Sequence, residues 1–240
     1  MHKILDIIRK RQSTRILFNS ERPIKEEDLK QILEAGRWAP TAHNMQNFQI
    51  IIVEDKKVLD AIEKIETMVS ETFIRENLEQ LSFSEEELLK KKVGILGTMF
   101  PPAWKTPGYK PHKDRDSIRP IQKSPILLIV VYDPRRRAPD SEGDFLGIVS
   151  LGCVMENMWL TANSLGISFH VVSAIGRGPV EKEIKGILNI PDHLKIPFAF
   201  RLGYPVSSAA KNLRVRRDIE DFTHYNRFGN RYKNGVRSII

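Results

Sequence analysis

Strand-like runs that alternate with helical patterns constrain the fold of this 240-residue chain most strongly. Four runs are rich in β-branched and apolar residues, as buried strands are: 49–54, 125–132, 167–173 and 197–202. Apolar residues at helical spacing mark the remaining segments: 4–11, 26–36, 56–79, 85–93, 145–165 and 180–188. Strands separated by helices predict a layered α/β or α+β domain.

Two of the expected helices carry specific predictions. Gly36 follows the last apolar position of helix 26–36, so we expect it to be the C-cap of that helix. Helix 145–165 is apolar on nearly all faces and long enough to suggest a membrane span. Its Glu156, Asn157 and Asn163 favour instead a helix buried in a core or in a dimer interface.

Composition limits the kinds of ligand, partner and cellular compartment that we expect for this chain. The net charge of +8 indicates an anionic partner, either a phosphorylated cofactor or a nucleic acid, but the sequence has no helix-turn-helix, zinc-finger or RNP pattern. The single Cys153 excludes an intramolecular disulfide and fits a reducing compartment. The N-terminal residues lack the apolar core of a signal peptide. We therefore expect one soluble, cytoplasmic domain spanning residues 1–240, with no membrane or nucleic-acid partner.

A polar loop, residues 40–46, leads directly into the first expected strand. It contains Pro40, Thr41, Ala42, Asn44 and Gln46. Asn44 and Gln46 each offer both donors and acceptors, and a loop this polar at the mouth of a buried strand predicts a ligand site. His43 by itself is more typical of an ordinary surface histidine.

Two basic clusters are candidates for binding a phosphate. If residues 11–15 are extended, Arg11, Ser13 and Arg15 project to one side, with Gln12 between them. Two guanidinium groups that flank a hydroxyl form a compact phosphate receptor. Arg214 and Arg216 repeat this alternation near the other end of the chain. For both clusters a solvated basic segment is the alternative, and for the second a nucleic-acid-binding tail is another.

A third candidate element is the turn Ser173, Ala174, Ile175 and Gly176, which follows an expected strand. Small residues there allow backbone N–H groups to approach a flat ligand closely. The sequence has no HExxH, CxxC or Walker motif, and its histidines lack metal-ligand spacing, so we expect no metal.

In chain order, these segments resemble the nitroreductase family of FMN-dependent oxidoreductases over nearly the whole chain. Arg11, Ser13 and Arg15 match its Arg-x-Ser-x-Arg/Lys element, and Pro40, Thr41, Asn44 and Gln46 match its Pro-Ser/Thr-x-x-Asn-x-Gln loop. The matching segments then continue with the long helix around 151–160, the turn 173–176, the strand exit 202–205 and the basic pair Arg214 and Arg216. Asn47 and Phe48 depart from the family's Pro-Trp, and the turn lacks the family's glutamate.

The resemblance implies an α+β sandwich with a mostly antiparallel central sheet flanked by helices, formed as a homodimer with FMN at the interface. It implies FMN binding by the segments above, with Arg15 also near flavin N1, and NAD(P)H as reductant. Electrons would pass in two hydride steps to a small oxidised acceptor such as a nitroaromatic or a quinone, and no side-chain acid or base would be needed. The basic arm 211–240 would cross to the other subunit.

We place acceptor choice in a lid at residues 96–120, with Phe100, Trp104 and Tyr109 as substrate contacts. An ordinary surface loop is the alternative there. For function, the alternatives are a reductive dehalogenase, a flavin-processing enzyme of the same fold, or a non-catalytic protein that binds flavin or nucleic acid.

Overall fold

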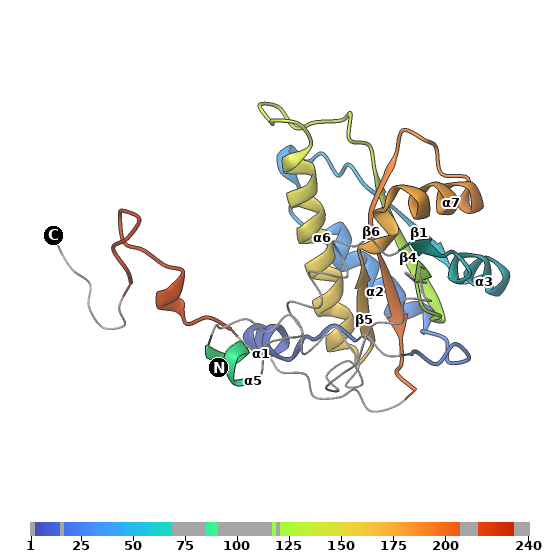
Figure 1. Cartoon of the computed structure of the whole chain (residues 1–240), viewed down its shortest axis with the longest axis horizontal. Coiled ribbons are helices and arrows are strands. Elements are labelled where there is room, and N and C mark those ends of the chain that lie inside the picture. The colour runs from blue at the N-terminus through green and yellow to red at the C-terminus, as the bar shows by residue number, and fades with distance from the viewer. Residues whose placement is uncertain are drawn as a thin grey trace. The chain divides into compact units, whose positions relative to one another are not determined.

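The computed structural model describes residues 3–14, 17–68, 85–90, 117–118, 121–206 and 216–232. The chain forms two units, one of Met1–Met68 with Ser117–Ala209 and one of Val69–Asp116 with Ala210–Ile240. The first unit contains the sheet and most of the helices (Figure 1). The interpretation of residues 1–240 as a single domain stays a prediction.

The first unit is built on a four-stranded antiparallel sheet in the order β1-β4-β6-β5. The strands are β1 (Gln49–Val53), β4 (Ile126–Tyr132), β5 (Ser168–Val172) and β6 (Lys195–Gly203). All four lie within two or three residues of the expected runs, because β-branched, apolar residues continue up to the turns on either side. The expected α+β fold with an antiparallel sheet is confirmed.

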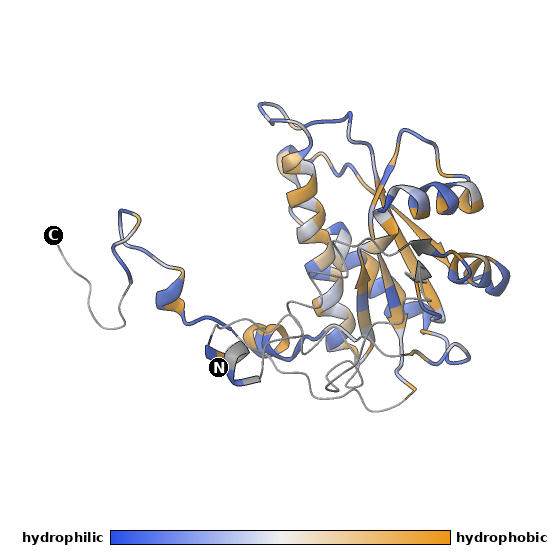
Figure 2. Cartoon of the chain, viewed as in Figure 1, coloured by the Kyte–Doolittle hydropathy of each residue, from blue (hydrophilic) through white to orange (hydrophobic). Residues whose placement is uncertain are grey.

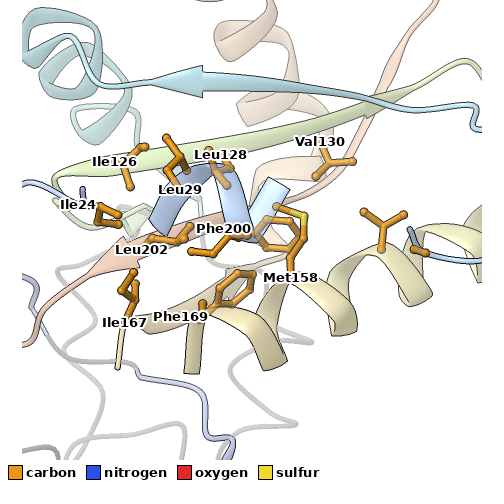
Figure 3. Packing of buried hydrophobic residues seen from close by; sticks show 14 of the residues in the cluster. Ile24, Leu29, Ile126, Leu128, Val130, Met158, Ile167, Phe169, Phe200 and Leu202 are labelled. Carbon is orange, nitrogen blue, oxygen red and sulfur yellow. The ribbon is translucent and has the colours of Figure 1, made fainter. Parts of the chain in front are cut away.

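β4 is the centre of the core. All seven of its residues are buried, and successive side chains of a strand point to opposite faces. Leu128 packs into a cluster with α2 (Glu26–Arg37) and α6 (Phe145–Ser164), whereas Ile129 packs with α3 (Lys56–Glu63) and α7 (Gly178–Leu188). The sheet therefore lies between two helical layers. Figure 2 shows the strands as mostly hydrophobic with a few polar positions, and Figure 3 shows Leu128, Phe200 and Met158 meeting on the α2–α6 side.

β1 was expected to be a buried strand, and this is wrong. It lies at the edge of the sheet, pairs only with β4 among the described strands, and leaves Ile52 44% exposed. A run of isoleucines has the same appearance in the sequence at an edge as in the centre of a sheet.

α6 covers the sheet with one face only. Its buried residues are Ser150, Leu151, Val154, Met158 and Ala162. Phe145 and Val149 are 66% and 48% exposed, so burial on every side does not occur within the described part of this chain. By length and composition α6 is the one described helix that could cross a membrane, a test that core helices of soluble proteins also pass.

Gly36 is not a C-cap. It lies inside α2, which ends at Arg37 with Trp38 as its C-cap. A Cβ at Gly36 would lie 3.0 Å from Cγ and Sδ of Met158. The glycine therefore permits close packing of α2 on α6.

The helix expected at 56–79 is shorter than the sequence suggests. α3 ends at Glu63, and β2 (Thr67–Met68) follows and pairs with β3 (Ser117–Ile118). Ile65, just after α3, is buried in the same hydrophobic cluster as Ile121. Residues 69–84 lie outside the described residues.

The remaining described helices are α1 (Lys3–Lys10) and α5 (Glu85–Lys90) in the positions expected for them. After Arg216 the chain forms a single helical turn, Ile219–Asp221, which Asp218 and Asp221 close with a reciprocal capping box.

Candidate functional site

The segment after α1 is extended beside the start of β5, as expected for residues 11–15. Ser13 forms a parallel bridge with Phe169, and the Thr14 N–H donates to the Phe169 carbonyl at 3.0 Å. Thr14 is buried while Ser13 is half-buried. The strand contact therefore fixes Ser13 at one end of β5. Arg15 lies outside the described residues.

The Arg11 side chain is held on α6. Its guanidinium carbon lies 4.1 Å from the centre of the Trp159 ring, and its Nε lies 3.2 Å from Oε1 of Glu156. The Trp159 indole N–H also donates to the Gln12 carbonyl at 3.3 Å. Arg11 is thus oriented before any ligand arrives, and an anion that bound it would share it with the Glu156 carboxylate.

The polar loop has a strained backbone. His43, Asn44 and Gln46 have φ values of 49°, 52° and 47°. Residues other than glycine adopt this left-handed conformation only uncommonly. Such strain persists only where surrounding contacts impose it, and it is frequent at binding sites. The sequence predicted a polar site here but not this conformation.

Hydrogen bonds hold the loop in this shape. The Gln46 N–H donates to the Thr41 hydroxyl at 3.2 Å, and Nε2 of the Gln46 side chain donates to Oδ1 of the Asn44 side chain at 3.1 Å. The Ala42 N–H donates to Oγ of Ser150 at 2.9 Å. The loop is therefore anchored to the N-terminal half of α6, and the exposed Asn44 and Gln46 side chains are oriented by each other.

Asn47 was identified only as a departure from the family pattern, and it has a definite role. Its Nδ2 donates to the carbonyls of Asp133 and Arg136 at 2.8 and 3.0 Å, and its Oδ1 accepts from the Asp133 N–H at 3.4 Å. These bonds tie the polar loop to the 133–137 loop. The sequence separation of 86 and 89 residues hides the contact from sequence reasoning.

The turn after β5 is tight. The Gly176 N–H donates to the Ser173 carbonyl at 3.2 Å, and Ile175 is fully buried. A Cβ at Gly176 would lie 2.7 Å from the carbonyl oxygen of Ile196 on β6. Gly176 was expected to be small so that a ligand could approach the backbone. In the structure, the close approach of β6 already requires a glycine at this position.

A cavity of about 490 Å³ lies beside this turn. Ser173, Gly176 and Arg177 line it together with Tyr132 and Asp144. The Tyr132 hydroxyl donates to Asp144 at 2.6 Å. Burial, with the Asp144 carboxylate, raises the pKa of Tyr132, so this phenol stays protonated at neutral pH.

The three candidate segments of the first unit lie along one strip formed by α6 and β5. Ser13 lies beside Phe169 and the 173–176 turn follows β5, about 13 Å further along at 3.3 Å per residue. The loop anchor Ser150 precedes Glu156 by six residues, about 9 Å along α6. Arg216 belongs to the second unit, and Arg214, Phe100, Trp104 and Tyr109 lie outside the described residues.

The family follows from a match that covers most of the chain. A model of the nitroreductase family matches residues 8–204. The chain belongs to the nitroreductase family. An NADPH-dependent oxidoreductase of Staphylococcus aureus is 20% identical over 225 residues, which cover 94% of this chain and 74% of that protein.

Solved nitroreductase structures share this fold. A nitroreductase with bound FMN from Bacteroides fragilis aligns with a TM-score of 0.59 at 20% identity and covers 90% of this chain and 96% of that chain. A nitroreductase with bound FMN from Desulfitobacterium hafniense aligns with a TM-score of 0.56 at 22% identity and covers 94% and 98%. In the described part of this nitroreductase-family chain, His, Cys, Asp and Glu form no group of three suited to a metal ion.

Proposed function

We propose that this nitroreductase-family protein is an FMN-dependent oxidoreductase that passes electrons from NAD(P)H to a small oxidised acceptor. The observation that carries the proposal is the α6–β5 strip, which presents an oriented Arg11 and Ser13 at one end and a tight backbone turn at the other. The family match supports it, as do the relatives described as NADPH-dependent or as binding FMN.

The donor chemistry of the strip fits FMN. Arg11 and Ser13 supply a cation and a hydroxyl suited to the phosphate, with Gln12 adjoining them and Arg15 completing the motif. Arg214 and Arg216 would add to the same phosphate. The pKa of a phosphate monoester keeps it largely dianionic at neutral pH, which favours two or more guanidinium partners.

The polar loop would face the middle of the cofactor. Asn44 and Gln46 carry donors and acceptors that suit ribityl hydroxyls and the pyrimidine edge, and Pro40, Thr41 and Ala42 shape the backbone beside them. Their strained, pre-formed arrangement would lower the entropy lost when a ligand binds.

The turn Ser173, Ala174, Ile175 and Gly176 would orient the flavin ring through backbone N–H groups. Because the Gly176 N–H is used inside the turn, we assign the donor to the half-buried Ala174. FMN, when bound, supplies the hydride chemistry, while the protein binds and orients it and sets its electrostatics. We keep the lid 96–120, with Phe100, Trp104 and Tyr109, as the proposed site of contact with nitroaromatic or quinone acceptors.

Exposed apolar faces support the proposed homodimer. Ile4 and Leu5 on α1 are 61% and 40% exposed, and Phe145, Ile148 and Val149 on α6 are also exposed. Apolar surface of this kind is usual where a partner binds. A second copy, with the arm 211–240 crossing between subunits, would cover these faces in a soluble cytoplasmic protein.

An absorbance spectrum of the purified protein, before and after addition of FMN and gel filtration, tests the proposal. We expect flavin bands that persist through the column and bleach on addition of NADPH or NADH under anaerobic conditions. Protein that loses all flavin on the column would contradict FMN binding. Bound flavin that neither nucleotide reduces would indicate a non-catalytic flavin-binding protein.

A further inference from the structure

The 133–137 loop carries three consecutive arginines beside the polar loop. Asp133 binds the first of them, since Arg135 donates from Nε at 2.9 Å and from Nη2 at 2.8 Å. These bonds hold the pKa of Asp133 at about 2, so its carboxylate is ionised and engaged at neutral pH. Among the described residues no ion pair joins Arg136 or Arg137 to a carboxylate.

Arg136 has its backbone fixed at both its N–H and its carbonyl. Its carbonyl accepts from Asn47 Nδ2 at 3.0 Å, and its N–H donates to the Asp133 carbonyl at 3.1 Å. The residue lines a cavity of about 400 Å³ together with Gln46, Phe48 and His193. This volume is in the range of small-molecule sites, and a planar guanidinium at its wall can bind a phosphate through two parallel hydrogen bonds.

Gln46, one of the residues proposed to lie along the flavin, also lines this cavity. A nicotinamide nucleotide that reaches the flavin must extend its adenosine half away from the ring. NADPH carries a 2′-phosphate on that half and NADH does not, and an arginine is the usual residue that accommodates this group. Arg136, at the wall of this cavity, is therefore available to bind the 2′-phosphate, the group that distinguishes NADPH from NADH.

We propose that Arg136, positioned by Asn47, binds the 2′-phosphate of NADPH and makes the protein prefer NADPH over NADH. This rests on the proposed function for its physiological meaning. Arg136 is a specificity-determining residue, and Asn47 is a positioning residue that acts through the 133–137 loop.

Calorimetric titration of the full-length protein with 2′,5′-ADP and with 5′-AMP tests the proposal, because the two probes differ only by the 2′-phosphate. We expect the wild-type protein to bind 2′,5′-ADP more tightly. R136Q should weaken that binding by about 10- to 100-fold, the scale of a charged hydrogen bond, and should leave 5′-AMP binding nearly unchanged. N47A should act in the same direction, since it releases the loop.

K57Q is the matched control. It removes one positive charge from the exposed surface of α3, which follows the end of β1 that is farther from Asn47. We expect it to leave both affinities unchanged. Flavin content and the ratio of kcat/KM for NADPH to that for NADH provide a second measurement. In R136Q this ratio should fall because the KM for NADPH rises.

Three results would overturn the proposal: a wild-type protein that does not discriminate between the probes, an R136Q protein that still does so equally well, or equal weakening of both probes in R136Q. The last would show that Arg136 senses net charge or the 5′-phosphate. The titration needs no flavin and no turnover, so failure of the oxidoreductase proposal would be seen separately, in the spectrum.

Discussion

Glu181 and Lys185 form a buried ion pair on α7, close to the turn at 173–176. Both side chains are 10% exposed, and Lys185 Nζ lies 3.2 Å from Glu181 Oε1. Glu181 also accepts the Ile196 N–H at 3.0 Å, and Lys185 donates to the Asp192 carbonyl at 3.1 Å. The pair therefore ties α7 to β6 at the residue whose carbonyl touches Gly176.

Each single substitution leaves the other charge buried without its partner. The two single losses in unfolding free energy should therefore sum to more than the loss in the double variant. Two charges at 3.2 Å attract each other by about 5 kcal/mol at an effective dielectric constant of about 20, and much of this offsets their desolvation. E181L leaves a buried ammonium and K185L a buried carboxylate, each a loss of about 3–5 kcal/mol in unfolding free energy. K185L should lie at the lower end, since Lys195 Nζ, 3.8 Å from Glu181, compensates in part.

The double variant removes both charges and leaves only the Ile196 N–H and the Asp192 carbonyl without these partners. We expect it to lose about 2–5 kcal/mol, well below the sum of the single losses. Urea denaturation of the four proteins, followed by circular dichroism, measures the coupling. Losses that add within about 0.5 kcal/mol would refute the reasoning. The exposed Arg37–Glu34 pair is the control, and its coupling should be much smaller than that of the buried pair, because water screens both charges.

Three further predictions follow from the structure. R11A should weaken FMN binding about 10- to 100-fold in a fluorescence titration, because a guanidinium fixed over Trp159 is lost; unchanged affinity would remove Arg11 from the phosphate site. G176A should destabilise the protein by about 1–3 kcal/mol in thermal unfolding, because its Cβ would lie 2.7 Å from the Ile196 carbonyl oxygen; G178A, where a Cβ would meet nothing within 4 Å, is the matched control and should be nearly neutral apart from helix propensity. Sedimentation at low micromolar concentration should show a dimer, since α1 and α6 expose apolar faces; a compact monomer would contradict the proposed homodimer.

The strands were predictable because their apolar runs are local signals. α3 was predicted too long because the segment after Glu63 continues with good helix formers and no proline. Just after the helix, Ile65 is buried in a cluster whose members come from distant parts of the chain, among them Ile121, 56 residues away in the sequence. Gly36 was misassigned for the same reason, since its partner Met158 is remote in sequence.

The candidate site was predictable in composition but not in geometry. The polar loop and the 11–15 segment were identified from residue types, yet three left-handed residues in the loop and the contact of Trp159 with Arg11 depend on contacts made after folding.

Nothing in the sequence indicated that Arg201 would be buried. It is fully buried on β6 and hydrogen-bonds to the Lys123 carbonyl at 2.9 Å, where burial lowers its pKa to about 10.

α6 links the stability of the core to the geometry of the site. Its buried face carries Val154 and Met158 against the sheet, while Ser150 holds the polar loop and Trp159 holds Arg11. A change that shifts α6 on the sheet would therefore move the proposed phosphate and ribityl contacts together relative to the turn at 173–176. A packing mutation such as Met158→Ala, which touches no proposed ligand, should consequently weaken FMN binding as well as the fold, whereas an exposed change on α3 should affect neither.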